Sequence, residues 1–239
     1  LAIDDGGYSA IDNTVPPGPT VPLFCLDALT GGTTVGLTDD SLSAVINLPF
    51  TFNFYGAAFT QVSICSNGFL SFPADSVSFT AQIIPNAATP NGMCAFHWND
   101  LNPTLGGTIT FATGGTAPNR FFAVDFNGIS HFADGNPCRA RCYLLENGDI
   151  VMMEGAATSD GSRTEIGIER GDGQVGYHYL ESSVAGTFLA NRAIRFTQNP
   201  ANPLPDFQAP DQVTNLTCNP LSDTAIQLNW TESGDDCLS

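Results

Sequence analysis

Residues 143–152 read Tyr-Leu-Leu-Glu-Asn-Gly-Asp-Ile-Val-Met, two short apolar runs on either side of Asn147-Gly148. This residue pair supplies the two positive-φ positions of a type I′ turn, so the stretch predicts a β-hairpin. Asp172-Gly173 occupies a similar place between the apolar runs 166–168 and 175–177. The two stretches predict antiparallel strands joined by tight turns.

Short apolar or alternating runs recur at strand spacing on both sides of these hairpins. The chain has 24 Gly and 16 Pro, and only residues 75–81 and 182–190 have room for a helical turn. We therefore expect an all-β fold, an antiparallel β-sandwich of about a dozen strands. The expected strands are Leu23–Leu29, Ser43–Phe54, Phe59–Ile64, Gly68–Phe72, Met93–Trp98, Thr108–Phe111, Arg120–Phe126, Cys142–Leu145, Ile150–Glu154, Glu165–Glu169, Gln174–Tyr179 and Ala193–Phe196. The expected core contains Phe50, Phe52, Phe54, Ile64, Phe69, Phe96, Trp98, Phe122, Val124, Ile166 and Ile168.

Proline and glycine divide the chain into four segments. Residues 1–22 predict an extended Pro-rich arm, 23–198 the sandwich, 199–211 a Pro-rich linker, and 212–239 an incomplete second unit. The second unit has two alternating strands, whereas an immunoglobulin-like sandwich needs about seven.

Two strands alone are marginally stable in water and leave an apolar face uncovered. That face consists of Leu216, Ile226, Leu228 and Trp230. One interpretation is that residues 2–22 of a neighbouring copy cover it by β-augmentation, which propagates into a fibre. The other is that further strands belong to a longer chain, and the sequence leaves both open.

The charge balance excludes several classes of function. With 24 acidic residues against 7 basic ones, the net charge is −17, which would repel a phosphate backbone and excludes a general nucleic-acid binder. All the basic residues are Arg, so Schiff-base and other lysine chemistry is absent. The longest apolar runs, of about five residues, fall short of the ~20 that a membrane helix needs.

The seven cysteines, without Cys-x-x-Cys pairs, predict disulfides in an oxidising compartment. The chain starts with Leu1 rather than Met, so we expect that a leader has been removed and that the protein is extracellular or on the cell surface. The sequons at Asn215 and Asn229 are glycan acceptors in a eukaryotic secretory path. The expected disulfide pairs are Cys138 with Cys142, Cys218 with Cys237 and Cys65 with Cys94, leaving Cys25 unpaired or intermolecular, although six cysteines alone allow 15 connectivities.

Acidic loops are the best candidates for a metal site. Their carboxylate and amide oxygens are the hard ligands that suit Ca²⁺, and none has the spacing of an EF-hand. The candidate Ca²⁺ ligands are Asp39, Asp40, Asn99, Asp100, Asp134 and Asp172.

The three histidines lie beside aromatic residues, which favours structural, partly buried side chains over a zinc triad of His97, His131 and His178. A hydrolytic triad of Ser66, His97 and Asp100 can be drawn, but the Gly-x-Ser-x-Gly elbow is absent. A pair of carboxylates for glycoside hydrolysis stays open, because its separation in space defines it. No catalytic residue is assigned.

Three segments resemble the nidogen-like (NIDO-like) domains of extracellular proteins: residues 48–56, 66–72 and 95–101. Segments 117–120, 145–150 and 166–169 look like later parts of bacterial versions of this module, and the resemblance covers Val21 to Thr197. The piece with Pro210, Val213, Leu216 and Trp230 looks like the opening of a fibronectin type III domain. The resemblance implies a β-sandwich in a secreted, multidomain surface or matrix protein.

Three functions compete at this stage. The first is a non-enzymatic structural or adhesion module that associates with itself or with neighbouring modules of a longer surface protein. The second is a Ca²⁺-assisted carbohydrate-binding module that uses acidic loops and exposed aromatics such as Tyr55, Trp98 or Tyr179. The third is a hydrolase fragment or an accessory domain of a secreted hydrolase. Neither nucleic acid nor membrane insertion fits the sequence, and Ca²⁺ is the one cofactor that it suggests.

Overall fold

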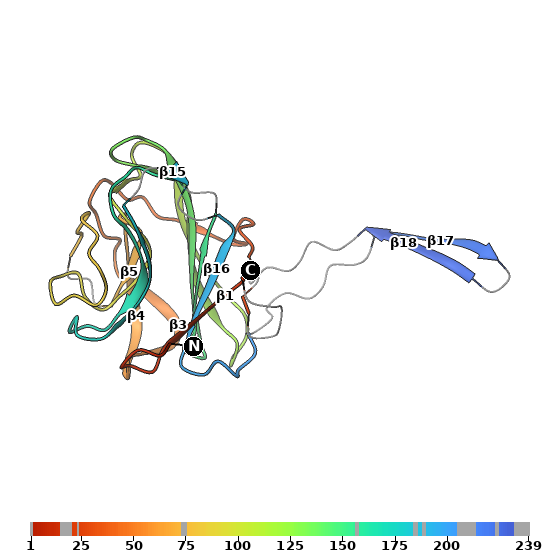
Figure 1. The fold of residues 1–239 in the computed structure, drawn as a ribbon, viewed down its shortest axis with the longest axis horizontal. Coiled ribbons are helices and arrows are strands. Elements are labelled where there is room, and N and C mark those ends of the chain that lie inside the picture. Colours follow the sequence, from red (N-terminus) through yellow and green to blue (C-terminus); the bar gives the residue numbers. More distant parts are fainter. Residues whose placement is uncertain are drawn as a thin grey trace.

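Two antiparallel β-sheets face each other and enclose one apolar core, as Figure 1 shows, so the expected all-β sandwich is confirmed. The computed structural model describes residues 2–14, 21–22, 24–72, 76–155, 158–183, 186–187, 190–204, 214–222 and 225–231. No helix occurs among these residues, including those of 75–81 and 182–190 that are described. The same part of the chain therefore contains no helix that meets the length and hydropathy needed to cross a bilayer.

The larger sheet has eight strands. Its order is β1-β16-β11-β10-β9-β8-β2, with β7 paired to the far end of β9. The bounds are β1 Ser9–Asp12, β16 Arg192–Thr197, β11 Ile150–Glu154, β10 Pro137–Leu145, β9 Phe121–His131, β8 Thr108–Gly114, β2 Thr33–Thr34 and β7 Leu101–Asn102.

The second sheet has six strands in the order β14-β13-β6-β5-β4-β3. Two further pairs stand outside these sheets, β12 with β15 and β17 with β18. The bounds are β14 Gly176–Ser182, β13 Thr164–Glu169, β6 Met93–Trp98, β5 Phe69–Ser71, β4 Ala57–Cys65, β3 Ile46–Phe54, β12 Thr158–Ser159, β15 Gly186–Thr187, β17 Thr214–Ser222 and β18 Ala225–Thr231.

Alternation along the strands builds the core. In β3, Leu48, Phe50, Phe52 and Phe54 are buried while the residues between them are not, as a strand with one buried face requires. All eleven residues expected in the core are buried. Phe69 and Trp98, however, pack in a separate cluster with Met93 and Ile84 rather than in the main core.

The two expected hairpins form, but the predicted type I′ turns are wrong. Only the glycines adopt the left-handed conformation, Gly148 at φ 91° and Gly173 at φ 65°, whereas the residues before them do not. The Gly148 amide donates to the Leu145 carbonyl at 2.9 Å, and the Asn147 side chain accepts the Asp149 amide at 3.0 Å. This is the pattern of a type I turn followed by a left-handed glycine, the next most common hairpin connection.

The N-terminal segment is not the free arm expected for residues 1–22. β1 pairs with β16 in the larger sheet, with Ser9 opposite Thr197 and Asp12 opposite Ile194. The Tyr8 side chain is fully buried in the main core. Residues 15–20 of the segment lie outside the described residues.

The expected disulfides also differ from the structure. Cys65, Cys94, Cys138, Cys142 and Cys218 are free, whereas Cys25, which was expected to be unpaired or intermolecular, is disulfide-bonded. Cys237 lies outside the described residues.

Strand geometry explains two of these corrections. Cys138 and Cys142 lie four residues apart on one strand, about 13 Å, and a disulfide needs Cα atoms within about 7 Å. Cys65 and Cys94 lie on β4 and β6, with β5 between them, and they belong to different apolar clusters. They therefore cannot bridge.

The β17–β18 hairpin stands apart from the sandwich in Figure 1. Leu216 and Leu228 are 62% and 53% exposed, which agrees with an uncovered face. The fibronectin type III resemblance stays a prediction, because two strands are common to many β-folds.

Candidate functional site

Three chain segments meet at one end of the sandwich: the loop before Ser41, the β4–β5 turn and the β6–β7 connection. Asn67 in the β4–β5 turn joins them. Its side-chain amide donates to Asp40 at 2.8 Å, and its side-chain oxygen accepts the Leu101 amide at 3.0 Å. Asn67 is fully buried, so these bonds are shielded from water.

Gly68 permits the close approach of this turn to β6. Its carbonyl accepts the amides of Phe96 at 3.1 Å and His97 at 3.0 Å. Gly68 has φ 79°, and a Cβ atom at this position would collide with the His97 carbonyl. Only glycine therefore fits between the turn and the strand that carries His97.

Three of the six candidate Ca²⁺ ligands come together here. Each of Asp39, Asp40 and Asp100 has one carboxylate oxygen within 4.8 Å of the other two. Within the described residues, none of the three forms an ion pair with an arginine. Asp40 adopts a left-handed φ of 45°, which an aspartate tolerates in a turn. The result is a compact group of hard oxygen ligands, which we name the acidic group.

The acidic group is electrostatically unfavourable as it stands. Burial first, and then the charges of Asp40, Asp39 and Asp160, together raise the pKa of Asp100 to about 6. Burial and the neighbouring Asp40 also raise the pKa of Asp39. A divalent cation would relieve this repulsion, because it favours the ionised carboxylates.

The other three candidate ligands have different partners. The buried Asn99 side chain bonds to the Thr164 hydroxyl at 2.6 Å and to the Ser162 hydroxyl at 2.8 Å. Asp134 bonds to Asn136 within its own exposed turn, and Asp172 pairs with Arg170 at 2.7 Å. None of them joins the acidic group.

Close to the acidic group, two histidines meet in the core. His97 on β6 and His131 at the end of β9 are both fully buried, and their Nε2 atoms are 3.3 Å apart. His97 Nδ1 lies 2.9 Å from Glu154 Oε2, and His131 Nδ1 lies 2.8 Å from the Asn136 carbonyl. The β7–β9 pairing places His131 opposite Leu101, and so brings the second sheet's His97 and the larger sheet's His131 together.

Neither His-containing set that the sequence allowed is assembled. His178 lies elsewhere, with Nδ1 2.5 Å from Glu165 and a side chain 37% exposed, so it does not join the other two histidines. The hydroxyl of Ser66 accepts the Ser41 amide at 2.9 Å. Nδ1 of His97 faces Glu154, and Nε2 faces His131. The Ser66, His97 and Asp100 triad is therefore not formed.

Two carboxylates of this region were missed by sequence reasoning. Glu154 ends the apolar strand β11 and is fully buried, and its Oε1 has no hydrogen-bond partner within the described residues. Asp160 bonds to Ser162 through Oδ1, whereas its buried Oδ2 is likewise without a partner in that part of the chain. The signal for Glu154 was an acid at the end of the run Ile-Val-Met-Met-Glu, but nothing in the sequence connected it to a histidine 57 residues away.

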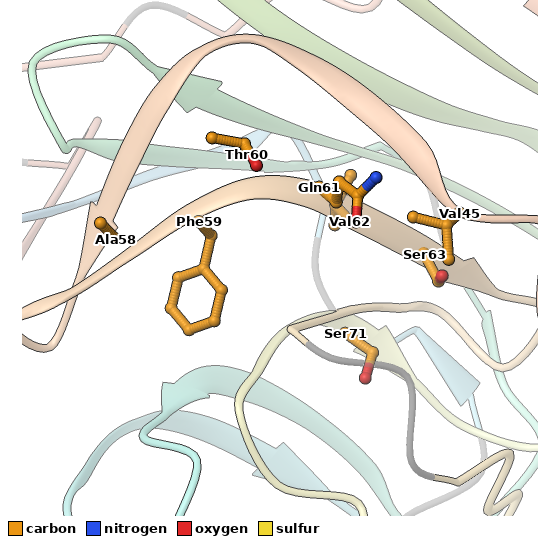
Figure 2. A pocket seen from close by; sticks show the side chains of 8 residues that line it. All are labelled: Val45, Ala58, Phe59, Thr60, Gln61, Val62, Ser63 and Ser71. Atoms are coloured by element: carbon orange, nitrogen blue, oxygen red, sulfur yellow. The ribbon is translucent and has the colours of Figure 1, made fainter.

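A second surface feature lies along β4. Because β5 pairs only with Ser63–Cys65, the preceding part of β4 borders a hollow of about 240 Å³. Figure 2 shows it lined along β4 by Ala58 to Ser63, with Val45 and Ser71 also at its rim. Among the described residues, no titratable side chain lines the hollow, so they give it shape and hydroxyl groups rather than charge.

The fold, together with the end of the sandwich that carries the acidic group, defines a class of protein. It is an all-β sandwich module with an oxygen-rich loop cluster and a buried histidine pair. The chain belongs to the NIDO related (nidogen-related) family, which matches residues 25–204. Comparison with curated proteins found no match, and comparison with solved structures also found none. Membership of a nidogen-related family indicates an extracellular module.

Proposed function

We propose that this chain is a non-enzymatic structural or adhesion module of an extracellular or cell-surface protein, and that Ca²⁺ bound by the acidic group holds its loops. The observation that carries the proposal is the convergence of Asp39, Asp40 and Asp100. Extracellular modules commonly bind Ca²⁺ with Kd values of about 10⁻⁴ to 10⁻³ M, which suits a small set of carboxylates on loops.

Ca²⁺ at the acidic group would stabilise the contact between two loops. Asp39 and Asp40 belong to the turn before Ser41, and Asp100 belongs to the β6–β7 connection. Asn67 already bonds to both sides, so a cation adds to an existing junction instead of ordering a new one. This is the role of a structural ion, and it needs no reacting substrate.

Association with other modules is the second part of the proposal. The exposed Leu216 and Leu228 of the β17–β18 hairpin support contact with a neighbouring module or with another copy of the chain. Exchange of residues 2–22 between copies has weaker support, because β1 would have to leave β16 and Tyr8 would have to leave the core.

A carbohydrate-binding module is less well supported. Trp98 is 1% exposed, so its ring is not available for stacking on a sugar. The hydroxyls of Tyr55 and Tyr179 are held by Asp4 at 2.5 Å and by Asp12 at 2.6 Å. The aromatic residues on which this alternative depended are thus engaged within the fold.

Thermal unfolding with and without Ca²⁺ tests the proposed ion. With 10 mM Ca²⁺ and a Kd of about 1 mM, the folded state should gain about 1.4 kcal/mol. Asp40→Asn should remove the gain, and Asp172→Asn should keep it, because Asp172 lies outside the acidic group. An equal response to Ca²⁺ in Asp40→Asn and in the unmodified chain would refute the site.

Sedimentation tests association. The chain should show concentration-dependent association that Leu216→Asp and Leu228→Asp abolish together, while the sandwich keeps its unfolding midpoint. A glycan array probed in the presence of Ca²⁺ tests the alternative function, since specific glycan binding would favour the carbohydrate-binding module.

A further inference from the structure

The paired imidazoles of His97 and His131 have their nitrogen atoms arranged as metal ligands. A backbone carbonyl can only accept a hydrogen bond, so the 2.8 Å contact with Asn136 places a proton on Nδ1 of His131. In a neutral ring this leaves Nε2 with a lone pair, and that lone pair faces Nε2 of His97. An ionised Glu154 has the same effect on His97, because it accepts from Nδ1.

Two lone pairs 3.3 Å apart repel each other, so either a proton or a metal ion lies between the two Nε2 atoms. The proton needs no net charge, because a neutral Glu154 can donate to Nδ1 of His97 and leave the ring proton on Nε2. Zinc bound at about 2.05 Å in a tetrahedral arrangement holds two nitrogen ligands roughly 3.3–3.4 Å apart, which matches the observed separation. The outer nitrogens, bonded to a carboxylate and to a carbonyl, have the partners that metal-ligating histidines usually have.

The geometry, rather than the charge, favours the metal ion. Both Nε2 atoms converge at the separation of two ligands on one ion, and both Nδ1 atoms are fixed by hydrogen-bond partners. Burial raises the pKa of Glu154, so without a metal ion this carboxyl is held toward its neutral form. A divalent cation would replace the proton between the rings and stabilise the ionised Glu154, because unpaired buried charges are costly.

We propose that Nε2 of His97 and Nε2 of His131 bind a divalent transition-metal ion such as Zn²⁺, with Glu154 positioning His97 and Asp160 as the third ligand. Asp160 precedes β13 on a loop, and its unpartnered Oδ2 is the free ligand atom. The two histidines and Asp160 do not yet lie within 4.8 Å of one another, because the acidic group alone does so among the described residues. Coordination by Asp160 therefore requires its loop to move toward the imidazoles.

The proposed metal differs from the Ca²⁺ proposed for the acidic group. Imidazole nitrogen suits Zn²⁺, Ni²⁺ or Cu²⁺, whereas Ca²⁺ takes oxygen ligands. The two sites can therefore be tested independently, and either can fail without the other.

Calorimetric titration of the metal-stripped chain with Zn²⁺, and visible spectroscopy with Co²⁺, test the site. One equivalent should bind, with the absorption of a four-coordinate Co²⁺ ion. His131→Gln should lower the affinity at least 100-fold, and Glu154→Gln, which touches only the ligand His97, should lower it about 10–100-fold. His178→Gln is the matched control and should bind like the unmodified chain, since His178 lies apart, beside Glu165.

Two results would overturn the proposal. One is the absence of binding to the unmodified chain, and the other is equal binding to His131→Gln. If that variant does not fold, nitrogen NMR of the unmodified chain decides instead: Zn²⁺ should shift Nε2 of His97 and His131 but neither nitrogen of His178. Asp40→Asn should leave these shifts intact, and their loss would assign the metal to the acidic group.

Discussion

The guanidinium of Arg195 binds the carboxylate of Asp149 through Nε at 3.0 Å and through Nη2 at 2.5 Å. The Arg195 side chain is 0% exposed and that of Asp149 is 5% exposed. Arg195 lies on β16, and Asp149 ends the turn of the β10–β11 hairpin, so the pair attaches the hairpin to the neighbouring strand. Arg195 also donates to the Asn202 carbonyl at 2.9 Å, beyond the end of the strand.

Removing one member of this pair should be costly. Asp149→Leu leaves a buried guanidinium without its carboxylate, and we expect a loss of about 3–5 kcal/mol in the free energy of unfolding. Urea denaturation measures it. The control is Asp172→Leu, which breaks the exposed pair with Arg170 and should cost far less, because solvent screens this pair. Equal costs for the two variants would contradict the role given to burial.

Phe52→Ala should destabilise the sandwich by about 3–5 kcal/mol, because it removes a fully buried ring from the main core. The ring stacks on Phe54 and Phe72, with centroids 6.0 and 5.7 Å away. Phe79→Ala, at a position 50% exposed, is the control and should change stability by less than about 1 kcal/mol. A Phe52→Ala loss below about 1 kcal/mol would place the ring outside the core.

Gly68→Ala should cost at least about 2 kcal/mol, because an alanine there combines a left-handed backbone with a collision against the His97 carbonyl. Gly36→Ala is the control, since Gly36 has open space and no positive φ, and it should stay within about 0.5 kcal/mol. Thermal unfolding compares them. Similar midpoints for both variants would show that the β4–β5 turn can move away from β6.

The raised pKa of Asp100, about 6, predicts a pH dependence. The unfolded carboxyl titrates near 3.9, so the folded state binds more protons between about pH 4 and pH 6. Stability from this group therefore falls as pH rises through that window. Without divalent cations, the urea midpoint of Asp100→Asn should rise relative to that of the unmodified chain as the pH increases from 4 to 7.

Asp172→Asn gives a control of opposite sign for this measurement. The bond to Arg170 lowers the pKa of Asp172, so its contribution is present above the unfolded value and is lost as pH falls. A stability difference between Asp100→Asn and the unmodified chain that is constant from pH 4 to pH 7 would rule out the raised pKa.

Thiol labelling should separate one cysteine from four others. Cys218 is exposed, whereas Cys65, Cys94, Cys138 and Cys142 are buried. Burial raises the pKa of Cys65 to about 12 and also raises those of the other three, so their reactive thiolate is scarce. Peptide mapping after brief native labelling should find Cys218 modified and these four modified only after denaturation. Rapid labelling of Cys94 in native protein would contradict the burial.

Local patterns predicted most of the strands and the core, because each depends on neighbours in the sequence. The strand expected at Leu23–Leu29 is wrong, since the described residues 24–29 form none. The alternation in β3 and the glycines after Asn147 and Asp172 specify strand faces and hairpins directly. The pairing of β1 with β16 was missed, because it joins residues as distant in sequence as 9 and 197. The run Ser-Ala-Ile-Asp is also too short to predict a strand.

The site was predicted only in its residue types. Asp39, Asp40 and Asp100 were identified as oxygen ligands, but the sequence could not separate them from Asp134 and Asp172, which form equally acidic turns. The contact between His97 and His131 depends on how the two sheets pack face to face. No periodicity within either strand encodes that contact.

The pairing of β1 with β16 sets how the sandwich responds to mechanical tension. Ser9 and Thr197 face each other at the same end of this antiparallel ladder. A pull that reaches Ser9 from the N-terminal side and Thr197 from the C-terminal side therefore loads one hydrogen-bonded pair at a time. The ladder opens like a zipper, at low force, instead of resisting in shear, and it releases Tyr8 from the core while the inner strands β11, β10 and β9 stay paired. In a stretched matrix or surface fibre this edge would be the first part of the sandwich to yield.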